Sequence, residues 1–271
     1  MAEPESTDLS EQKKGQTFWD HLDELRNVLV RIVITIVILA IGAFCIMPWF
    51  FDNVVLAPCH ADFPFYRVID YITSHSPVGT GISADPFNLT PVSLQLTSQF
   101  FIHFSAACWT AAVVAFPVII YQLWTFVAPA LYDNEKTGIR KAFFFGNLMF
   151  YLGVLTGYFI VFPLALRFLA TYQLSESIQT VVSLDSYMDN FYTLILLMGA
   201  VFELPLLAWL LGKAGFITRS FFKKYRRHAI VALLIIAALI TPTGDPFTLL
   251  AVFIPIYALW EFSARIVPPT N

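Results

Sequence analysis

Long apolar stretches alternate with short polar ones along most of the chain. Because a helix needs about 20 apolar residues to cross the ~30 Å hydrocarbon core of a bilayer, each long stretch predicts a membrane-spanning helix. The first four such stretches are residues 32–51, 100–124, 142–166 and 190–212. A fifth, from His228 to Trp260, is interrupted by TPTGDP (241–246), a Pro/Gly/Asp cluster typical of a turn.

The turn divides the last stretch into helices over 229–241 and 247–262, so the pattern predicts six spans. A helix of about 13 residues is only ~20 Å long. We therefore expect the last two helices to be short, and either to thin the bilayer or to be shielded by their neighbours. A re-entrant hairpin is the alternative interpretation of this pair.

Proline and glycine positions suggest the form of the bundle. Prolines fall inside four predicted helices, at Pro117, Pro163, Pro205 and Pro255. Each removes a backbone hydrogen bond and bends its helix, so we expect an all-α integral membrane protein with a bowed, concave bundle. Gly153 and Gly157 lie one turn apart and allow close helix packing, which we expect within the chain; the sequence leaves self-association open.

The distribution of basic residues predicts the topology. With the N-terminus counted as inside, all but two of the 16 Lys and Arg residues fall in inside segments, and the two exceptions are Arg67 and Arg167. Positive residues mark cytoplasmic loops, so both termini are expected in the cytoplasm. A hairpin for the last pair would give the same result.

We expect one membrane domain between two tails. Residues 1–17 form a polar cytoplasmic tail without an apolar core, so no cleaved signal is expected and the first span is retained. Residues 18–265 form the six-helix domain, with an extracytoplasmic cap of turns and short helices over 52–99. Residues 266–271 form the C-terminal tail.

Composition excludes several classes of function. The chain is 58% hydrophobic and 13% charged, with a mean hydropathy of +0.69, whereas soluble domains carry about twice that charged fraction. A net charge of −3 offers no case for nucleic acid. Cys59, His60 and His75 are too few and too widely spaced for a metal site, and no phosphate-binding loop is present, so we expect no metal, no cofactor and no catalysis.

Two polar segments lie next to predicted spans on the cytoplasmic side. FWDHLDELRNVLVR (18–31) repeats apolar residues at intervals of three and four, which predicts an amphipathic helix lying at the membrane interface. WTFVAPALYDNEKTGIRK (124–141) contains several acidic and basic residues. In the simplest interpretation the charges of both segments are solvated, with Asp133 or Asn134 capping the next helix.

Glu203 lies near the middle of the fourth span, in VFELPLL (201–207). An ionisable group at that depth costs at least ~2.5 kcal/mol and usually faces a partner or a water-filled cavity. We therefore expect a functional role for Glu203. Asp245, in the turn between the last two helices, is explained more simply as a helix cap.

Several motifs together resemble the TatC family, the membrane subunit of twin-arginine protein translocases. The motifs are HLDELR (21–26), YQLWTFVAPALYDNE (121–135), YFIVFPLALRFL (158–169), FELP (202–205) and TPTGDPF (241–247). The resemblance runs from about residue 18 to 265, apart from the loop 59–85. It implies a receptor in the bacterial inner membrane that binds signal peptides of folded cargo bearing two adjacent arginines, recruits single-span TatA/TatB-type partners, and depends on the proton-motive force without hydrolysing ATP.

The resemblance also implies site residues. Glu24 and Glu135 match the carboxylates of the family's signal-binding patch, Phe126 matches a position required for the same recognition, and Arg26 lies in the same motif as Glu24. Further residues match positions linked to partner contact or to the turn of the last helix pair: Glu203, Thr241, Pro242 and Asp245. The chain departs from some relatives at Asn134 and Leu249, and in having one basic residue directly after Glu135.

The physical chemistry agrees with this assignment, because a carboxylate forms a bidentate, charge-assisted pair with arginine that lysine cannot reproduce. Two rival functions remain at this stage. A secondary transporter would use Glu203 as a proton or ion relay, but such proteins usually show internal repeats, and none is visible here. A membrane hydrolase would need a nucleophile and a base on one helix face, which His103 and Ser105 do not share.

Overall fold

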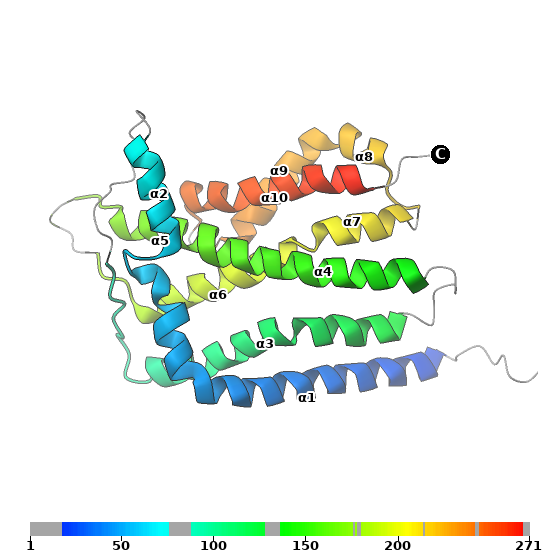
Figure 1. The fold of residues 1–271 in the computed structure, drawn as a ribbon, viewed down its shortest axis with the longest axis horizontal. Coiled ribbons are helices and arrows are strands. Elements are labelled where there is room, and N and C mark those ends of the chain that lie inside the picture. Colours follow the sequence, from blue (N-terminus) through cyan, green and yellow to red (C-terminus); the bar gives the residue numbers. More distant parts are fainter. Residues whose placement is uncertain are drawn as a thin grey trace, which may run out of the picture.

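The computed structural model describes residues 18–75, 88–127, 136–175, 177, 180–213, 215–241 and 244–267. The described part is helical, and its long helices run roughly side by side (Figure 1). One isolated bridge, between Val92 and Ser183, is the extent of β-pairing in these residues. The tail 1–17 lies outside the described residues.

The bounds of the helices in chain order are α1 Phe18–Phe50, α2 Pro64–His75, α3 Ser98–Val127, α4 Lys136–Thr156, α5 Phe162–Thr171, α6 Leu184–Val201, α7 Leu204–Lys213, α8 Arg219–Lys224, α9 Arg226–Ile240 and α10 Pro246–Ile266. The six predicted spans correspond to α1, α3, α4 with α5, α6 with α7, α9, and α10. Apart from α9, each of these contains a stretch that is long and apolar enough to cross a bilayer. The predicted all-α membrane fold is confirmed.

The last two helices differ in length. α9 has 15 residues and spans about 22 Å, so it is short as expected. α10 has 21 residues, which is about 31 Å, and the expected end at 262 is too early. The apolar stretch stops at Glu261, and the sequence therefore suggests that the helix ends there. In the structure Glu261 is paired with Arg226 at 2.6 Å, and the helix continues past this charge to Ile266. The length of α10 favours a spanning helix over a re-entrant hairpin.

The segment 18–31 does not form a separate interfacial helix. It is the first part of α1, which continues without a break for 33 residues, or about 50 Å (Figure 1). No glycine or proline lies between Phe18 and Ile41 to turn the chain. Leu22 and Leu29 are exposed on this straight extension.

The proline-containing spans are interrupted in two places. A π-helical stretch, Gly157–Val161, joins α4 to α5 just before Pro163. α6 and α7 are separated by a turn at Phe202 and Glu203, just before Pro205, which has no N–H to donate to the carbonyl of Val201. Pro117 and Pro255 stay inside α3 and α10. A fifth proline, Pro48, lies near the end of α1 and was not among those expected to bend a span.

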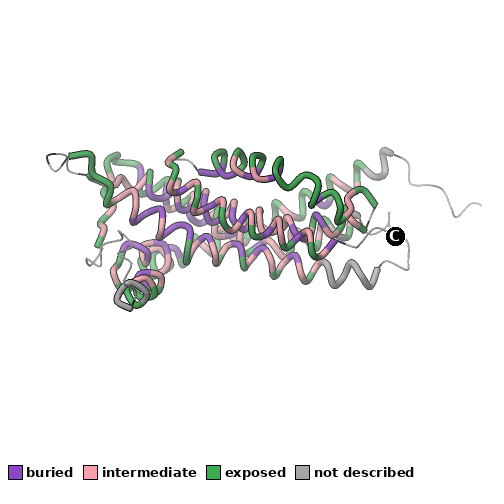
Figure 2. Tube along the Cα trace, turned by 90° about the horizontal axis from the view of Figure 1, so that it is seen from above, coloured by how far each residue is buried: buried purple, intermediate pink, exposed green. Residues whose placement is uncertain are grey.

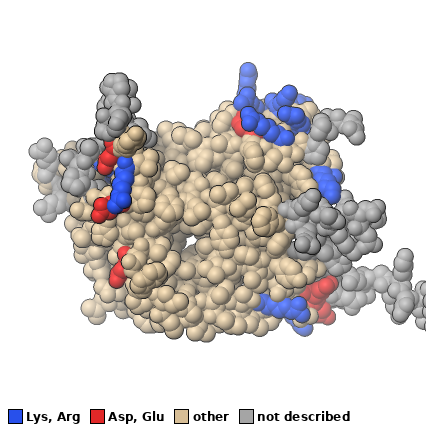
Figure 3. Space-filling model, viewed as in Figure 1, with Lys and Arg blue, Asp and Glu red and all other residues tan. Residues whose placement is uncertain are grey.

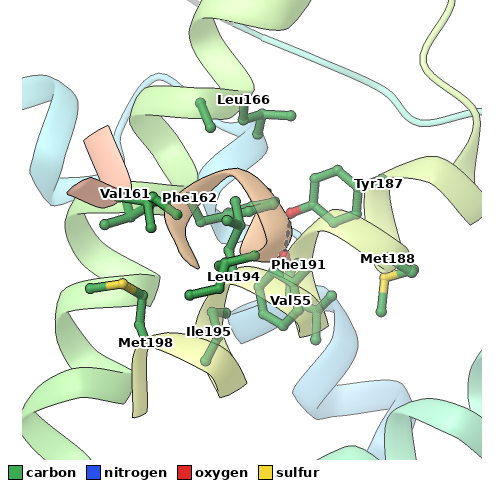
Figure 4. Packing of buried hydrophobic residues seen from close by; sticks show 14 of the residues in the cluster. Val55, Val161, Phe162, Leu166, Tyr187, Met188, Phe191, Leu194, Ile195 and Met198 are labelled. Atoms are coloured by element: carbon green, nitrogen blue, oxygen red, sulfur yellow. Dashed lines mark hydrogen bonds between the residues drawn. The ribbon is translucent and has the colours of Figure 1, made fainter. Parts of the chain in front are cut away.

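The helices form two packed groups. α1 packs chiefly along α3, around Met47 and the small residues Ala106 and Ala107. α4, α5, α6, α9 and α10 share the larger core, part of which is shown in Figure 4. An apolar pocket of about 500 Å³ opens between the two groups, and Figure 3 shows a hollow near the middle of this face. The bundle is thus hollowed on this face.

Each long helix buries one face and exposes another, so buried and exposed positions alternate along the tubes in Figure 2. The exposed face of α1 is almost entirely apolar, with Val33, Val37, Ile38 and Ile41 all at least half exposed. Such a surface is stable only against lipid or a partner helix.

At the end of the bundle away from Phe18 and Val267, tyrosine hydroxyls bind backbone carbonyls that follow α1. Tyr158 donates to the carbonyl of Val54 at 2.8 Å. Tyr187 donates to the carbonyl of Val55, as Figure 4 shows. The carbonyls belong to the π-helical turn Phe51–Val55, where α1 ends and the chain bends towards α2 (Figure 1). These bonds join the two helix groups at this end.

Gly153 and Gly157 bring α4 against α6. A Cβ on Gly153 would lie 2.5 Å from the carbonyl oxygen of Met198, and one on Gly157 would lie 3.0 Å from the Cα of Ile195. The close contact expected from this glycine pair is therefore confirmed, and it lies within the chain.

Replacing Gly153 with alanine is expected to destabilise the protein by about 1–3 kcal/mol, because the new methyl group would overlap backbone that cannot move aside. The measurement is the thermal unfolding midpoint in detergent. Gly42→Ala is the matched control, since a Cβ on Gly42 meets nothing within 4 Å. An equal midpoint for both variants would show that α4 and α6 can separate freely.

Candidate functional site

The start of α1 and the end of α3 lie at the same end of the bundle, because the two helices pack in opposite directions (Figure 1). Glu24 is in the second turn of α1, and Phe126 is the penultimate residue of α3. Both side chains are partly buried. The fold thus brings two predicted signal-binding residues, about 100 positions apart in the sequence, to one end of one helix pair.

Arg26 and Asp23 form an exposed pair beside Glu24. Their charged atoms are 3.9 Å apart, and about three-quarters of each side chain is exposed. A pair this exposed contributes little to stability. Glu135, the second carboxylate expected in the patch, lies outside the described residues, as do Asp133, Asn134 and Pro242.

Glu203 lies in the turn between α6 and α7. The backbone N–H of Glu203 donates to the carbonyl of Ala200 at 3.2 Å, three residues back, and the Glu203 carbonyl accepts from Leu207 at 3.0 Å. The chain therefore tightens just before Glu203 and resumes an α-helix after it. Pro205 explains the position of the break, since it cannot continue the hydrogen-bond ladder of α6.

The carboxylate of Glu203 lies over Gly146 of α4. A Cβ on Gly146 would be 3.2 Å and 3.8 Å from its two oxygens, and 2.6 Å from Leu206. Glycine at 146 is therefore what leaves room for the acidic side chain. One of the oxygens, Oε1, is buried and has no hydrogen-bond partner among the described residues. A buried polar atom left in this state costs about 1–3 kcal/mol.

Thr241 and Asp245 serve the turn between α9 and α10. Asp245 is the N-cap of α10 and accepts a 2.7 Å hydrogen bond from the backbone N–H of Thr248, which confirms its expected capping role. Thr241 ends α9, is buried, and directs its hydroxyl to the carbonyl of Ala238 at 3.4 Å. Gly244 takes a φ of +61°, which suits glycine in a tight turn.

The predicted site residues therefore fall into three places. Glu24, Arg26 and Phe126 lie at the end that bears Phe18 and Val267, Glu203 lies within the bundle, and Thr241 and Asp245 lie in a turn between helices. From Glu203 to the end of α7 at Lys213 is about 15 Å of helix. The predicted signal-binding residues and Glu203 cannot share one ligand group at this separation.

Two residues that make important packing contacts were not predicted from the sequence. Gly146 is one, and only its contact with Glu203 identifies it. Arg167 is the other: it is 7% exposed, and its guanidinium lies 5.3 Å from the ring centre of Tyr66, joining α5 to α2. The sequence signal for Arg167 is a lone arginine within the apolar run YFIVFPLALRFL (158–169).

The geometry gives no support to a hydrolase. His103 lies 3.0 Å from the Phe44 carbonyl and stacks on the Phe44 ring, and Ser105 donates to the carbonyl of Ile102 at 3.1 Å. Both side chains thus serve helix packing. In the parts of the chain that the structure covers, no three His, Cys, Asp or Glu residues are grouped so that they could hold a metal ion.

Comparisons with known proteins agree with this architecture. A family profile described as "Sec-independent protein translocase protein (TatC)" matches residues 20–255. The TatC protein of a Blattabacterium species is 33% identical over 264 residues, covering 95% of this chain and 97% of its own, and that of Helicobacter pylori (strain ATCC 700392 / 26695) is 35% identical over 251 residues, covering 93% and 87%.

The fold also matches a solved structure along nearly its whole length. A crystal structure of the "Twin Arginine Translocase Receptor- TatC in DDM" superposes with a TM-score of 0.72 at 30% identity, covering 92% of this chain and 99% of that one. The family is one of protein translocase components rather than catalysts. The helix order, the profile match and the full-length relatives agree, and the chain belongs to the TatC family of Sec-independent protein translocases.

Proposed function

We propose that this multi-pass membrane protein is the subunit that receives twin-arginine signal peptides, and that the end of the bundle bearing Glu24 and Phe126 is the docking site. The observation that carries the proposal is the packing of α1 against α3, which places a carboxylate and an aromatic ring at one end of the same helix pair. A carboxylate suits a guanidinium, and an aromatic face suits its planar, weakly hydrated surface. Glu135 supplies the second carboxylate.

The docking end faces the cytoplasm in this proposal, together with both termini. All but two of the 16 Lys and Arg residues belong to that side of the predicted topology, and the described ends, Phe18 and Val267, lie at the same end of the bundle (Figure 1). Signal peptides of unexported cargo reach this face first. Membership of the TatC family implies that the proton-motive force supplies the energy for export, and the sequence holds no phosphate-binding loop that would indicate ATP hydrolysis.

Single-span partners of the TatA/TatB type are proposed to assemble beside Glu203 and the α9–α10 pair. A carboxyl oxygen without a partner, in an otherwise apolar wall, favours a partner helix that carries a hydrogen-bond donor at the same depth. The alternative of a secondary transporter gains no support, since the relatives named above are protein translocases.

A peptide-binding experiment tests the docking site and its orientation together. Membrane vesicles containing the full chain are incubated with a signal peptide bearing two arginines, or the same peptide with two lysines. We expect the arginine peptide to bind at least tenfold more tightly, because a charge-assisted hydrogen bond contributes about 1.5–3 kcal/mol and lysine cannot form the bidentate pair.

Binding is expected to inside-out vesicles and not to right-side-out ones, because only the former expose the cytoplasmic face. Equal affinity for the two peptides would contradict recognition of arginine. Binding confined to right-side-out vesicles would reverse the proposed topology.

A further inference from the structure

Four basic side chains surround a small pocket where α8, α9 and α10 meet. The pocket has a volume of about 190 Å³, and its basic residues are Arg219, Lys223, Arg226 and Arg265. Two aromatic rings in contact, Phe222 and Trp260, line it with their centres 4.6 Å apart and their planes inclined by 50°. Figure 3 shows the corresponding concentration of basic side chains over α8.

The single carboxylate at this pocket is already engaged. Glu261 accepts a 2.6 Å hydrogen bond from Arg226 and a 2.9 Å hydrogen bond from the hydroxyl of Tyr257. The structure shows no ion pair to Arg219, Lys223 or Arg265 from any carboxylate it describes. Three uncompensated positive charges thus face one opening, which favours an anion with several acceptor oxygens.

The position of the pocket indicates the source of that anion. α9 begins at Arg226 and α10 ends at Ile266, so the pocket lies where two apolar helices leave the bilayer. Phe216, Phe221 and Tyr225 are exposed on the same segment. Exposed aromatic rings among basic residues are typical of protein at the level of lipid headgroups.

The neighbouring helix can accommodate acyl chains. α9 carries exposed Val231, Ile235 and Leu239 at intervals of four, and so presents one apolar stripe that begins one turn below the basic end. At 15 residues, α9 is also shorter than the hydrocarbon core, so lipid beside it must be drawn inwards. A headgroup bound at this end of α9 would hold the bilayer surface at the level set by the short helix, and so would stabilise local thinning of the bilayer.

We propose that this pocket binds the phosphate headgroup of an anionic phospholipid, in the leaflet at the end of the bundle that bears Phe18 and Val267. Arg219, Lys223 and Arg265 contact the phosphate oxygens, and Arg226 is held in place by Glu261. The site is independent of the signal-binding residues Glu24 and Glu135. It is a specific lipid site, distinct from the general attraction of basic loops to an acidic membrane surface.

The test uses the purified full chain in detergent, titrated with phosphatidylglycerol or phosphatidylcholine, with bound lipid counted by native mass spectrometry. We expect phosphatidylglycerol to bind at least fivefold more tightly. In the pocket variant, Arg219→Gln, Lys223→Gln and Arg265→Gln together, its affinity is expected to fall at least tenfold.

The matched control changes three basic residues of the same segment that do not line the pocket, Lys213→Gln, Lys224→Gln and Arg227→Gln. It removes the same net charge and is expected to keep phosphatidylglycerol affinity within twofold. The single variant Lys223→Gln tests the same pocket with less change to the fold, and is expected to lose at least threefold.

Three results would overturn the proposal. Equal losses in the pocket variant and its control would show that only net charge attracts lipid. Equal affinity for the two lipids would exclude recognition of the headgroup charge. Displacement of phosphatidylglycerol by millimolar inorganic phosphate would make the pocket a site for a free anion instead.

Discussion

Replacing Glu24 with glutamine is expected to weaken binding of a twin-arginine signal peptide at least tenfold, and Glu24→Gln combined with Glu135→Gln is expected to remove measurable binding. Glutamine keeps the size and helix propensity of the side chain but loses the charge that a guanidinium requires. A hydrogen bond to a charged group contributes about 1.5–3 kcal/mol, and every 1.4 kcal/mol is a factor of ten in affinity. The measurement is peptide affinity in inside-out vesicles.

Asp23→Asn is the matched control for Glu24→Gln. Asp23 is the adjacent carboxylate, it is far more exposed, and it is paired with Arg26 at 3.9 Å. Its replacement removes the same charge from the same turn, and we expect a loss of less than twofold. If Asp23→Asn weakened binding as much as Glu24→Gln, recognition would depend on the charge of the helix end. Unchanged affinity in both Glu24→Gln and Glu135→Gln would end the docking proposal.

The spans themselves were predictable from the sequence, because one physical requirement determines them. A helix in hydrocarbon must be apolar over about 20 residues, and four charge-free or nearly charge-free stretches met that condition directly. The N-cap of α10 was also predictable, because the signal is local: Asp245 follows a turn and precedes an apolar run. The same reasoning ended α10 too early, at residue 262, because it treated the charge of Glu261 as the end of the span. Glu261 is instead paired with Arg226 of α9, and a contact between helices cannot be read from local sequence.

The arrangement around Glu203 was not predictable in the same way. Its depth and the nearby proline were visible in FELP, and they indicated a functional carboxylate beside a bend. That this carboxylate lies over Gly146 depends on the register of α4 against α6 and α7, for which a single sequence carries no signal. The π-helical stretch before Pro163 and the two carbonyls bound by Tyr158 and Tyr187 depend equally on tertiary packing.

The separation of Glu203 from the proposed docking end leads to a prediction. Under the proposal, a peptide that binds through Glu24 and a partner helix that binds near Glu203 use different groups, so we expect both to be held at once. The apolar pocket between the two helix groups lies nearer the opposite end of the bundle, where Phe50, Val54 and Tyr158 line it. Effects on signal binding and on partner assembly are therefore expected to separate by mutation.

Glu203→Ala is accordingly expected to reduce crosslinking to TatA/TatB-type partners about fivefold to thirtyfold while leaving signal-peptide affinity unchanged. The reduction corresponds to about 1–2 kcal/mol, the contribution of one hydrogen bond between helices in a membrane. The measurement is site-specific crosslinking in vesicles that contain the partners. Glu203→Gln keeps a hydrogen-bonding group of the same shape, and is expected to retain most of the crosslinking if the partner supplies a donor.

The stability of the chain alone distinguishes this mechanism from misfolding. Oε1 of Glu203 is buried without a partner among the described residues, so removing it relieves an unfavourable interaction in the isolated chain. Glu203→Ala should therefore unfold at the same temperature as the unmodified chain or a higher one, even as it assembles less well. A lower unfolding temperature accompanied by loss of both signal binding and crosslinking would show that Glu203 supports the fold. Unchanged crosslinking in Glu203→Ala would show that partner helices dock elsewhere.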